Sequence, residues 1–494
     1  MATTAANASV YGGDEINAIV LDPGSFHTRI GYAGDDFPKV ITPSYYAVDA
    51  NDTTTTPKRI FGESINVPRA NHDIRPILTD SVITDWDAAI AQYTQYFETD
   101  LKIDYSDQPL LVTEPVWTNT KYRKQLVETF YESFGFSALY LARAPTCISF
   151  QQGRPNCLVV DIGHDSVSVT PVIDGISLLK NSMRTHYAGK FLSDQFQDVL
   201  SSSRGNQLAI EPTYKIKSKI PTVYPAEAQY TVRDNLPENI TTSYEEYQRQ
   251  RIFQELKETL LEAPEKKMVS NNVTHNTTVK EMYKQDSHKR MFEFPTGQSV
   301  ELSVERFQVA DSIFEPQSYK FKDETLAAKY PPDNGVLDFK GGYEDYKPLK
   351  RARKAESAQS TPPPSEAANG GATLKHKKAS GSNAPQIRGL SQLITQTLTS
   401  VDIDLRSSVA HNVIVTGSTS LIPQLTERLY GELSNMNPGL KIRLHATGNS
   451  TERFNQTWIG GSVLASLGSF HQMWVSKEEY EEAGTDRILS QRFR

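Results

Sequence analysis

The alternation of apolar and polar positions predicts a strand–loop–strand unit at residues 157–175, "CLVVDIGHDSVSVTPVIDG". An apolar run leads into Asp161, Gly163 interrupts it, and apolar alternation then resumes up to Asp174 and Gly175. A period of two is typical of β-strands, and glycine is typical of the tight turn between them. An acid and a glycine at a strand end are also what a phosphate-binding hairpin requires.

A second stretch near the start of the chain repeats this plan. Residues 18–36, "AIVLDPGSFHTRIGYAGDD", give an apolar strand, Asp22, Gly24, a polar loop and another strand that ends in glycine. The two stretches lie too far apart for a solenoid repeat, and they suggest two related domains that each contribute one hairpin. Either hairpin alone could be an ordinary Asp-Gly turn. The occurrence of both favours a shared binding role.

Strands and helices alternate around these hairpins. Residues 109–117, "PLLVTEPVW", predict a strand, and the segment after it predicts an amphipathic helix that ends near Gly135. Residues 140–150, "YLARAPTCISF", predict a strand that runs into a helix interrupted by Pro145. This alternation indicates an α/β architecture.

A third glycine loop follows a strand late in the chain. Residues 411–433, "HNVIVTGSTSLIPQLTERLYGEL", give a strand, the turn Gly417-Ser418-Thr419 and then a helix. Backbone N–H groups at such a turn attract anions. The signal is weak alone, because strand–glycine–helix turns are common, and it gains weight from the two hairpins.

Composition limits the class of protein. A chain of 494 residues is long enough for about three domains. The net charge of −7 argues against a surface that coats nucleic acid. Two cysteines, Cys147 and Cys157, fit a reducing compartment without a disulfide framework. With no secretory signal and no apolar run of about 18 residues, we expect a soluble intracellular protein and no membrane partner.

Two segments depart from the globular pattern. Residues 200–241 mix short apolar runs with turn residues and predict an elaborated subdomain. Residues 347–386 are rich in Pro, Ser, Gly and Ala and predict disorder. The basic clusters "KPLKRARK" (347–354) and "KHKK" (375–378) are interpreted as a nuclear-import signal, with solvated linker charge as the alternative.

The chain resembles the actin family, whose fold places two related α/β domains, in four subdomains, around a central nucleotide cleft. The resemblance covers residues 16–200, about 244–262, 291–316 and 388–494. The motifs that carry it are "GYAGDDFPK" (31–39), "VITDWD" (82–87), "LLVTEPVW" (110–117), "SVDIDLR" (400–406) and "WIGGSVLASLGSFHQMWVSKEEYEEAG" (458–484).

The resemblance implies a domain division. Residues 1–160 form the first lobe, and residues 459–494 pack back on it. Residues 161–458 form the second lobe, which includes the elaborated subdomain at about 200–245 and a disordered, basic, Pro- and Ser-rich insertion at about 320–387.

Departures from conventional actin indicate a branch of the family. Residues 48–64, "VDANDTTTTPKRIFGES", are short and rich in threonine, and they do not resemble the subunit-contact loop that actin filaments need. The insertions, with "YGGDEINAIVLDPGS" and "PNCLVVDIGHD", resemble a fungal-type class of nuclear actin-related proteins. That class serves as a stoichiometric subunit of chromatin-remodelling and histone acetyltransferase complexes. The resemblance therefore implies a nuclear chromatin regulator with roles in transcription and DNA repair.

The resemblance also implies the nucleotide contacts. Asp22 and Asp161 are expected to hold Mg²⁺ through waters, a mode that suits a hard octahedral ion. Gly24, Ser25 and Gly163 are expected to offer N–H groups to the phosphates of ATP or ADP.

The remaining contacts are implied in the same way. Arg29 stands where the family has a phosphate-contacting lysine, and Lys257 with Glu258 match the adenosine-contacting pair. Phe454 replaces a lysine near the base and is either a stacking partner of adenine or core. The other expected binding residues are His164, Asp165, Gly189, Gly417, Ser418 and Thr419.

The positions that handle the attacking water are altered. Actin uses a glutamine and a histidine there, and this chain has Ala144 and Ser168. Loss of a water-positioning or basic group typically costs about 10² to 10⁴ in rate. We therefore expect ATP binding without hydrolysis and no catalytic residue, with His164 as a phosphate-side or cleft-bridging group.

The expected partners follow from the resemblance. They are conventional nuclear actin, a helical segment of a Snf2-type remodeller ATPase or acetyltransferase platform subunit, and histones or the nucleosome. The helical segment would lie in a groove lined by Phe150, Val463, Leu464, Leu467 and Met473, unless these apolar residues belong to the core. The alternative function is a cytoskeletal polymer subunit with ATPase activity. A sugar kinase would need a catalytic base near the γ-phosphate, and the sequence offers no candidate. A chaperone ATPase would need an appended peptide-binding domain, which we do not expect in this chain.

Overall fold

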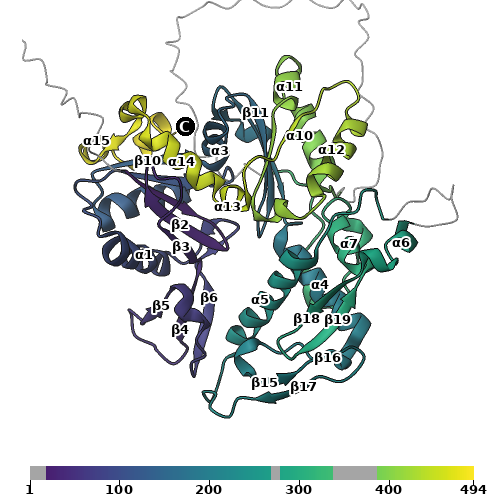
Figure 1. The fold of residues 1–494 in the computed structure, drawn as a ribbon. Helices are drawn as coiled ribbons and strands as arrows, with labels where there is room; N and C mark the ends of the chain where they lie inside the picture. The colour runs from purple at the N-terminus through teal and green to yellow at the C-terminus, as the bar shows by residue number, and fades with distance from the viewer. Residues whose placement is uncertain (1–17, 269–278, 338–386, 494) are drawn as a thin grey trace, which may run out of the picture.

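The first predicted hairpin begins one large sheet. β1 (Ile19–Pro23) pairs antiparallel with β2 (His27–Tyr32) and parallel with β9 (Leu110–Glu114) on its other side. The computed structural model describes residues 18–268, 279–337 and 387–493. Within them the strand order is β22-β10-β9-β1-β2-β3, completed by β3 (Val40–Pro43), β10 (Ala138–Arg143) and β22 (Val475–Ser476). This sheet organises the first lobe (Figure 1).

The second hairpin repeats the arrangement in the second lobe. β11 (Cys157–Ile162) pairs antiparallel with β12 (Val167–Ile173) and parallel with β20 (Val413–Thr416). The order is β13-β12-β11-β20-β21, and β14 also pairs with β12. These outer strands are β13 (Ile176–Ser177), β14 (Met183–Thr185) and β21 (Leu444–His445). The predicted α/β fold of two related domains is confirmed.

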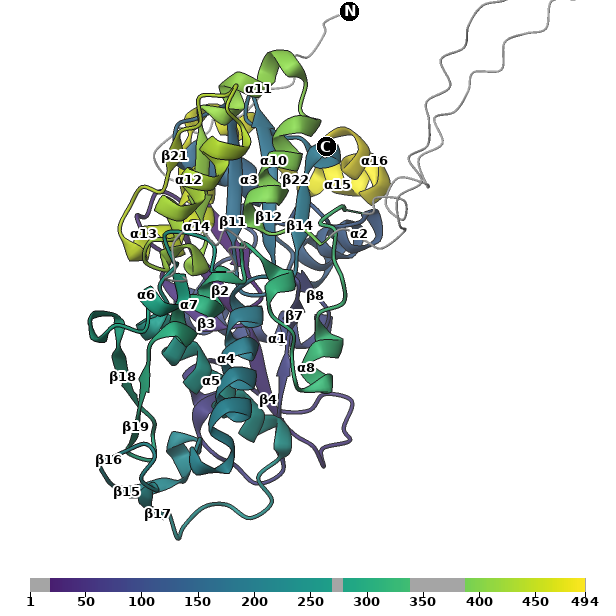
Figure 2. The same cartoon turned by 90° about the vertical axis from the view of Figure 1, so that its right-hand side faces the viewer.

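Helices cover both sheets (Figure 2). Their apolar faces are buried in two cores. The first core gathers Ile19, Val112 and Phe130 with residues of α1 and α2, and the second gathers Leu158, Val160 and Phe196 with residues of the helices around it. The helices are α1 (Trp86–Gln95), α2 (Thr120–Glu128), α4 (Gly189–Arg204), α5 (Thr242–Leu260), α7 (Val304–Asp311), α10 (Leu390–Ser400), α11 (Ile403–Ala410) and α12 (Leu425–Met436). None of the described helices is long and apolar enough to cross a bilayer.

The lobes meet where α3 (Ala144–Gln151) packs on α14 (Gln456–Ser466). The sequence predicted that Pro145 interrupts this helix, and that prediction is wrong. Pro145 lies in the first turn of α3, where a helix needs no N–H from that residue. The indole N–H of Trp458 donates to the carbonyl oxygen of Val20 over 3.0 Å. Residues after α14 return to the first lobe through β22, α15 (Lys477–Ala483) and α16 (Thr485–Gln491).

The lower part of each lobe is a smaller subdomain. In the first lobe it contains β4 (Tyr45–Asp49), β5 (Arg59–Ile60), a 3₁₀ turn (Gly62–Asn66) and β6 (His72–Pro76). In the second lobe it contains β15 (Ile216–Ile220), β16 (Thr222–Val223), β17 (Gln229–Val232), β18 (Arg290–Glu293) and β19 (Gln298–Leu302).

The start of the predicted disordered insertion, at about residue 320, is too early. Residues 320–337 contain α8 (Glu324–Lys329), and the rings of Phe321 and Tyr330 pack on Phe191 of α4. Two buried acids of α4 anchor this segment, because Asp194 accepts from the Tyr330 hydroxyl and Asp198 accepts from backbone N–H groups. Residues 338–386, with both basic clusters, lie outside the described residues.

The close packing of α3 on α14 predicts the effect of one substitution. A Cβ at Gly460 would lie 2.0 Å from the carbonyl oxygen of Cys147, and both groups belong to buried helices. Gly460→Ala should therefore cost roughly 1–3 kcal/mol of unfolding free energy, the usual range for overpacking. Gly468→Ala is the matched control, since a Cβ there meets no atom within 4 Å. Chemical denaturation of both variants measures the effect, and equal midpoints would contradict the packing argument.

Candidate functional site

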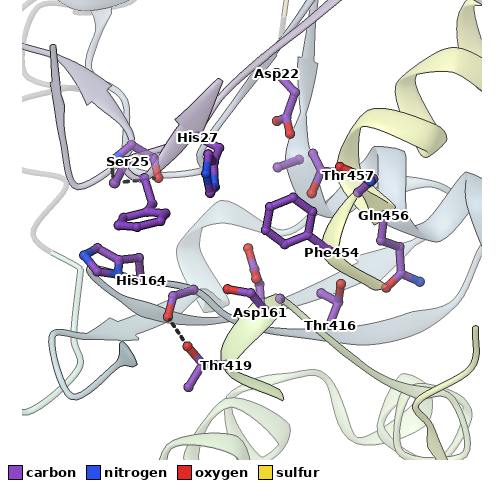
Figure 3. A pocket seen from close by; sticks show the side chains of 18 of the residues that line it. Asp22, Ser25, His27, Asp161, His164, Thr416, Thr419, Phe454, Gln456 and Thr457 are labelled. Carbon is purple, nitrogen blue, oxygen red and sulfur yellow. Dashed lines mark hydrogen bonds between the residues drawn. The ribbon is translucent and has the colours of Figure 1, made fainter. Parts of the chain in front are cut away.

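A cavity of about 630 Å³ lies between the two hairpins (Figure 3). All of the binding residues expected from the sequence line it except Gly189. Gly189 lies behind the wall instead, where a Cβ would come within 2.5 Å of Thr419 Oγ1 and 3.1 Å of the Gly163 oxygen. The two lobes thus bring fourteen of the expected residues to one cavity: Asp22, Gly24, Ser25, Arg29, Asp161, Gly163, His164, Asp165, Lys257, Glu258, Gly417, Ser418, Thr419 and Phe454.

The hairpin glycines do not present their own N–H groups to the cavity. The N–H of Gly24 donates to the His27 oxygen over 3.1 Å, and that of Gly163 donates to the Ser166 oxygen over 3.0 Å. These bonds close the two turns, so the expected N–H contribution of both glycines is corrected. Within the described part of the chain, the N–H groups of Ser25 and His164 inside the turns have no hydrogen-bond partner. They are the donors that an anion can use.

The two acids of the hairpins differ in their environment. Asp22 accepts from the Thr113 hydroxyl and lies 3.3 Å from Arg29 Nη1. The Asp161 carboxylate has no hydrogen-bond partner among the described residues, and burial together with the charge of Asp22 raises its pKa to about 6, against the opposing effect of Arg29. Gly417, with φ of 87°, passes so close that a Cβ would lie 2.5 Å from Asp161 Oδ1.

These acids fit a hydrated magnesium ion. Two carboxylates from different lobes, buried Asp22 and half-buried Asp161, face one cavity, and the second lacks a hydrogen-bonding partner of its own. Among the described residues there is no cluster of three or more His, Cys, Asp or Glu side chains for a metal held by protein alone. Mg²⁺ commonly uses one or two carboxylates together with waters and substrate phosphates, which is the donor set that this cavity offers.

Arg29 is part of the cavity wall. Its Nε donates to Asn455 Oδ1 over 2.8 Å and its Nη2 donates to the Phe454 oxygen over 2.9 Å. The Phe454 ring lies 4.4 Å from the guanidinium carbon and edge-on to His27. Most N–H groups of the Arg29 guanidinium therefore donate to protein acceptors, and the Phe454 ring covers the guanidinium.

The two histidines at the cavity are neutral in the folded protein. Burial lowers the pKa of His27 to about 4, helped by the charge of Arg29. Burial also holds the pKa of His164 well below its usual value, helped by Lys257, Lys190 and His27. The His164 ring lies 4.6 Å from the ring of Phe26 in the opposite lobe. His164 thus bridges the cleft without a charge.

Lys257 and Glu258 reach the cavity from the end of α5. The Lys257 ammonium donates to the Gly189 oxygen over 3.0 Å and to Gln254 Oε1 over 2.6 Å. Burial lowers the pKa of this lysine to about 8, although Glu258 and Asp194 oppose the shift. Glu258 is exposed at the rim. A buried ammonium without a paired carboxylate favours an acceptor on a ligand.

Ala144 and Ser168 line the same cavity as Asp161. Ser168 stands opposite Asp161 in the register of β11 and β12, and Ala144 begins α3. Neither side chain reaches far, and a methyl group cannot orient water. Glu114 also lines the cavity, but Arg123 and Arg143 hold its carboxylate at 3.0 and 3.4 Å.

Sequence reasoning missed Asp80, which joins the lobes beside the cavity. Its N–H donates to Asp165 Oδ2 over 3.1 Å, and its carboxylate lies 3.5 Å from Arg184 and 3.4 Å from His186 in the second lobe. Trp117 donates to its carbonyl oxygen over 2.9 Å. Asp80 has a left-handed backbone with φ of 52°. No local pattern in the sequence indicates such a contact.

Thr113 and Asn455 were missed as well. Thr113 is a polar residue at the end of the apolar run in "PLLVT", next to β1, and this position could have indicated a site residue. Asn455 carries no comparable signal, because only the packing of its segment brings it to Arg29.

Comparisons with known proteins agree with this geometry. A family model described as Actin matches residues 13–494. The chain therefore belongs to the actin family. Within the family it is similar to proteins named Actin-related protein 4. The one from Debaryomyces hansenii is 66% identical, with 100% of both chains covered. Those from Candida albicans and Saccharomyces cerevisiae are 58% and 38% identical, and at least 98% of each chain is covered.

The contact of Asp80 with His186 predicts a dependence of stability on pH. The hydrogen bond to Asp80 raises the pKa of His186, against burial and the charge of Arg184, and Asp333 adds to the increase. Burial alone would raise the pKa of Asp80, but His186, Arg184 and Lys190 bring it below its usual value. The stabilisation from charged His186 is complete below the ordinary histidine pKa of about 6.5 and is lost as the pH rises through the raised value.

Thermal unfolding of the native protein and His186→Gln should test this expectation. The native protein should be more stable at about pH 6, and the difference should shrink toward about pH 8. His471→Gln is the control, since His471 is exposed. A difference that stays constant or grows with pH would exclude the charged contact.

Proposed function

We propose that the chain is a non-catalytic scaffold subunit that binds ATP or ADP with Mg²⁺ and does not turn the nucleotide over. The observation that carries this proposal is the cavity itself. It keeps both hairpins and both acids, while Ala144 and Ser168 occupy the wall beside Asp161. An ATPase site of this fold needs a side chain that positions or deprotonates water; Ala144 has no polar group for this task, and the short Ser168 hydroxyl performs it poorly.

Different residues of the cavity would bind the metal ion, the phosphates and the adenosine. Asp22 and Asp161 would hold Mg²⁺ through waters, and the ion would neutralise phosphate charge. The N–H groups of Ser25 and His164 would donate to the phosphates from opposite lobes. Lys257 would donate to the adenosine side from α5. Because these donors come from two lobes, a bound nucleotide would tie the lobes together.

We also propose a place for this subunit in nuclear chromatin-remodelling and histone acetyltransferase complexes. Similarity to the fungal Actin-related protein 4 chains supports it, together with the apolar surface on α3, α14 and the segment after α14. Phe150, Val463, Leu467 and Met473 are each 37–43% exposed there. Leu464 is 5% exposed and belongs to the core, so it is removed from the expected groove.

This surface suits one face of an amphipathic partner helix. Apolar side chains at spacings of three and four residues fit such a groove. The proposed partner is a helical segment of a Snf2-type remodeller ATPase or acetyltransferase platform subunit, with conventional actin alongside and histones or the nucleosome nearby. The alternative, a polymer subunit with ATPase activity, finds less support, since β4 and β5 are joined by the short threonine-rich connection in place of a filament-contact loop.

The absence of turnover is tested with purified protein free of conventional actin. We expect the native chain to retain ATP and to release phosphate about 10² to 10⁴ times more slowly than conventional actin in the same assay. Asp161→Asn should lose the nucleotide and serves as the site control. Phosphate release at the rate of actin, abolished by Asp161→Asn, would exclude a non-catalytic role.

The partner groove is tested by charge substitution. Val463→Glu with Leu467→Glu places two acids on exposed positions, so folding should be kept while binding of the partner helix falls by about 30-fold or more. Ile403→Glu is the matched control, because Ile403 is 75% exposed on α11, away from the groove. Affinity purification with quantitative mass spectrometry reads the outcome. Unchanged recovery of actin and the remodeller subunit would rule out this groove.

A further inference from the structure

The chain passes from the second lobe to the first between α13 (Ser450–Phe454) and α14, and we call residues 453–455 the crossover segment. Its last residue, Asn455, follows α13, precedes α14 and is 1% exposed. Just beyond it, Trp458 donates to a carbonyl oxygen of β1 in the first lobe. The position of this short connection therefore depends on the groups that hold it on either side.

Arg453 fixes the crossover segment to the second lobe. Its Nη1 donates to the Ser420 oxygen over 3.3 Å, and its Nη2 donates to the Ala446 oxygen. Ser420 lies in the turn after Gly417, and Ala446 follows β21. The second lobe thus holds the first residue of the segment through two carbonyl oxygens.

Arg29 of β2 fixes the other two residues of the segment to the first lobe. Its Nε donates to Asn455 Oδ1 over 2.8 Å, and its Nη2 donates to the Phe454 oxygen over 2.9 Å. Asn455 Nδ2 donates in turn to the Thr451 oxygen over 3.1 Å, so the amide is held with its oxygen toward Arg29. One guanidinium therefore grips the segment at a side chain and at the backbone.

The ring of Phe454 is placed by the same guanidinium. Its centre lies 4.4 Å from the guanidinium carbon of Arg29 and 5.4 Å from the ring centre of His27. Figure 3 shows the ring away from Ser25 and His164, whose N–H groups are the donors available to phosphates. A planar fork can stack on a ring and direct donors at the same time, which a lysine ammonium cannot do.

Few donors of Arg29 remain for a phosphate. A guanidinium has five N–H groups. Nε and one group on Nη2 donate to the crossover segment, and Nη1 lies 3.3 Å from Asp22 Oδ2 and 3.5 Å from the His27 oxygen. The carboxylate of Asp22 also balances the positive charge. The contacts of this arginine are thus largely made within the protein.

We propose that Arg29 is a positioning residue, which holds the crossover segment and the Phe454 ring against the first lobe and so shapes the nucleoside side of the cavity without binding phosphate. The inference rests on the proposed binding of ATP or ADP. It adds that this side of the site is built by an arginine that does not touch the ligand.

The test compares the affinities of adenosine, ADP and ATP, measured by displacement of a fluorescent ATP analogue. Arg29→Lys keeps a positive charge beside Asp22 and removes the fork that holds the crossover segment. All three ligands should then bind about tenfold more weakly, the scale of two net hydrogen bonds, and by the same factor. A loss that grows with the number of phosphates, or native affinity for all three ligands, would overturn the proposal.

A second variant keeps Arg29 and removes its partner. Asn455→Ala deletes the oxygen that accepts from Nε, so the three ligands should bind about fivefold more weakly, again by one factor. Because both changes break the same contact, the double variant should bind no more weakly than Arg29→Lys alone. Losses that add in full would show that Arg29 acts on the ligand directly, which would overturn the proposal.

Arg406→Lys is the matched control. Arg406 Nη2 donates to the Thr399 and Val401 oxygens over 2.8 and 2.9 Å, so it also holds a connection between two helices, but it lies outside the cavity wall. This variant should bind all three ligands with native affinity, and circular dichroism checks that every variant folds. An equal loss in Arg406→Lys would overturn a specific role for Arg29.

Hydrogen exchange without nucleotide separates this proposal from nucleotide binding itself. The Ile459 amide donates to the Asn455 oxygen over 2.9 Å at the start of α14. Its exchange should be faster in Arg29→Lys and Asn455→Ala than in the native protein and Arg406→Lys. Failure of the native protein to bind any of the three ligands would refute the proposed function, and exchange would then decide the role of Arg29. Equal exchange in all four proteins would overturn that role.

Discussion

The repulsion between two carboxylates that face one cavity is the constraint on which this structure depends. Asp22 and Asp161 come from different lobes, and both are largely withdrawn from water. Arg29 pairs with the first, while burial and the charge of Asp22 raise the pKa of the second. A cation between them relieves the repulsion, and the lobes are then most favourably placed on either side of it.

The protein holds these acids in place by contacts at three levels. The α3–α14 packing joins the lobes at the top, and Asp80 joins them beside the cavity through Arg184 and His186. Tyr244 joins them at the bottom. The polarity of each contact matches its exposure to water: the apolar contacts are buried, and the ionic contact is partly exposed. Together these contacts hold the two acids on facing walls of one cavity.

The wall of the cavity near Asp161 carries short side chains and an acid that is already paired. The residues that line the cavity near Asp161 are Ala144 and Ser168, and the carboxylate of Glu114 is paired with two arginines. A cavity of this kind offers binding groups from both lobes. On the proposed function, the nucleotide would serve as part of the structure, and the proposed partner contact would fall to the exposed apolar surface around Val463 and Leu467.

The sequence by itself determined the two hairpins, their acids and the α/β alternation, because strand periodicity and Asp-Gly turns are local properties of the chain. Only the tertiary structure decided how the turns use their N–H groups, that Phe454 covers Arg29, and that residues 320–337 fold onto α4. Asp80 and Tyr244 act on residues of the other lobe that are distant in sequence. Such contacts depend on how two folded lobes meet, and no local pattern of side chains encodes which distant residues will lie together.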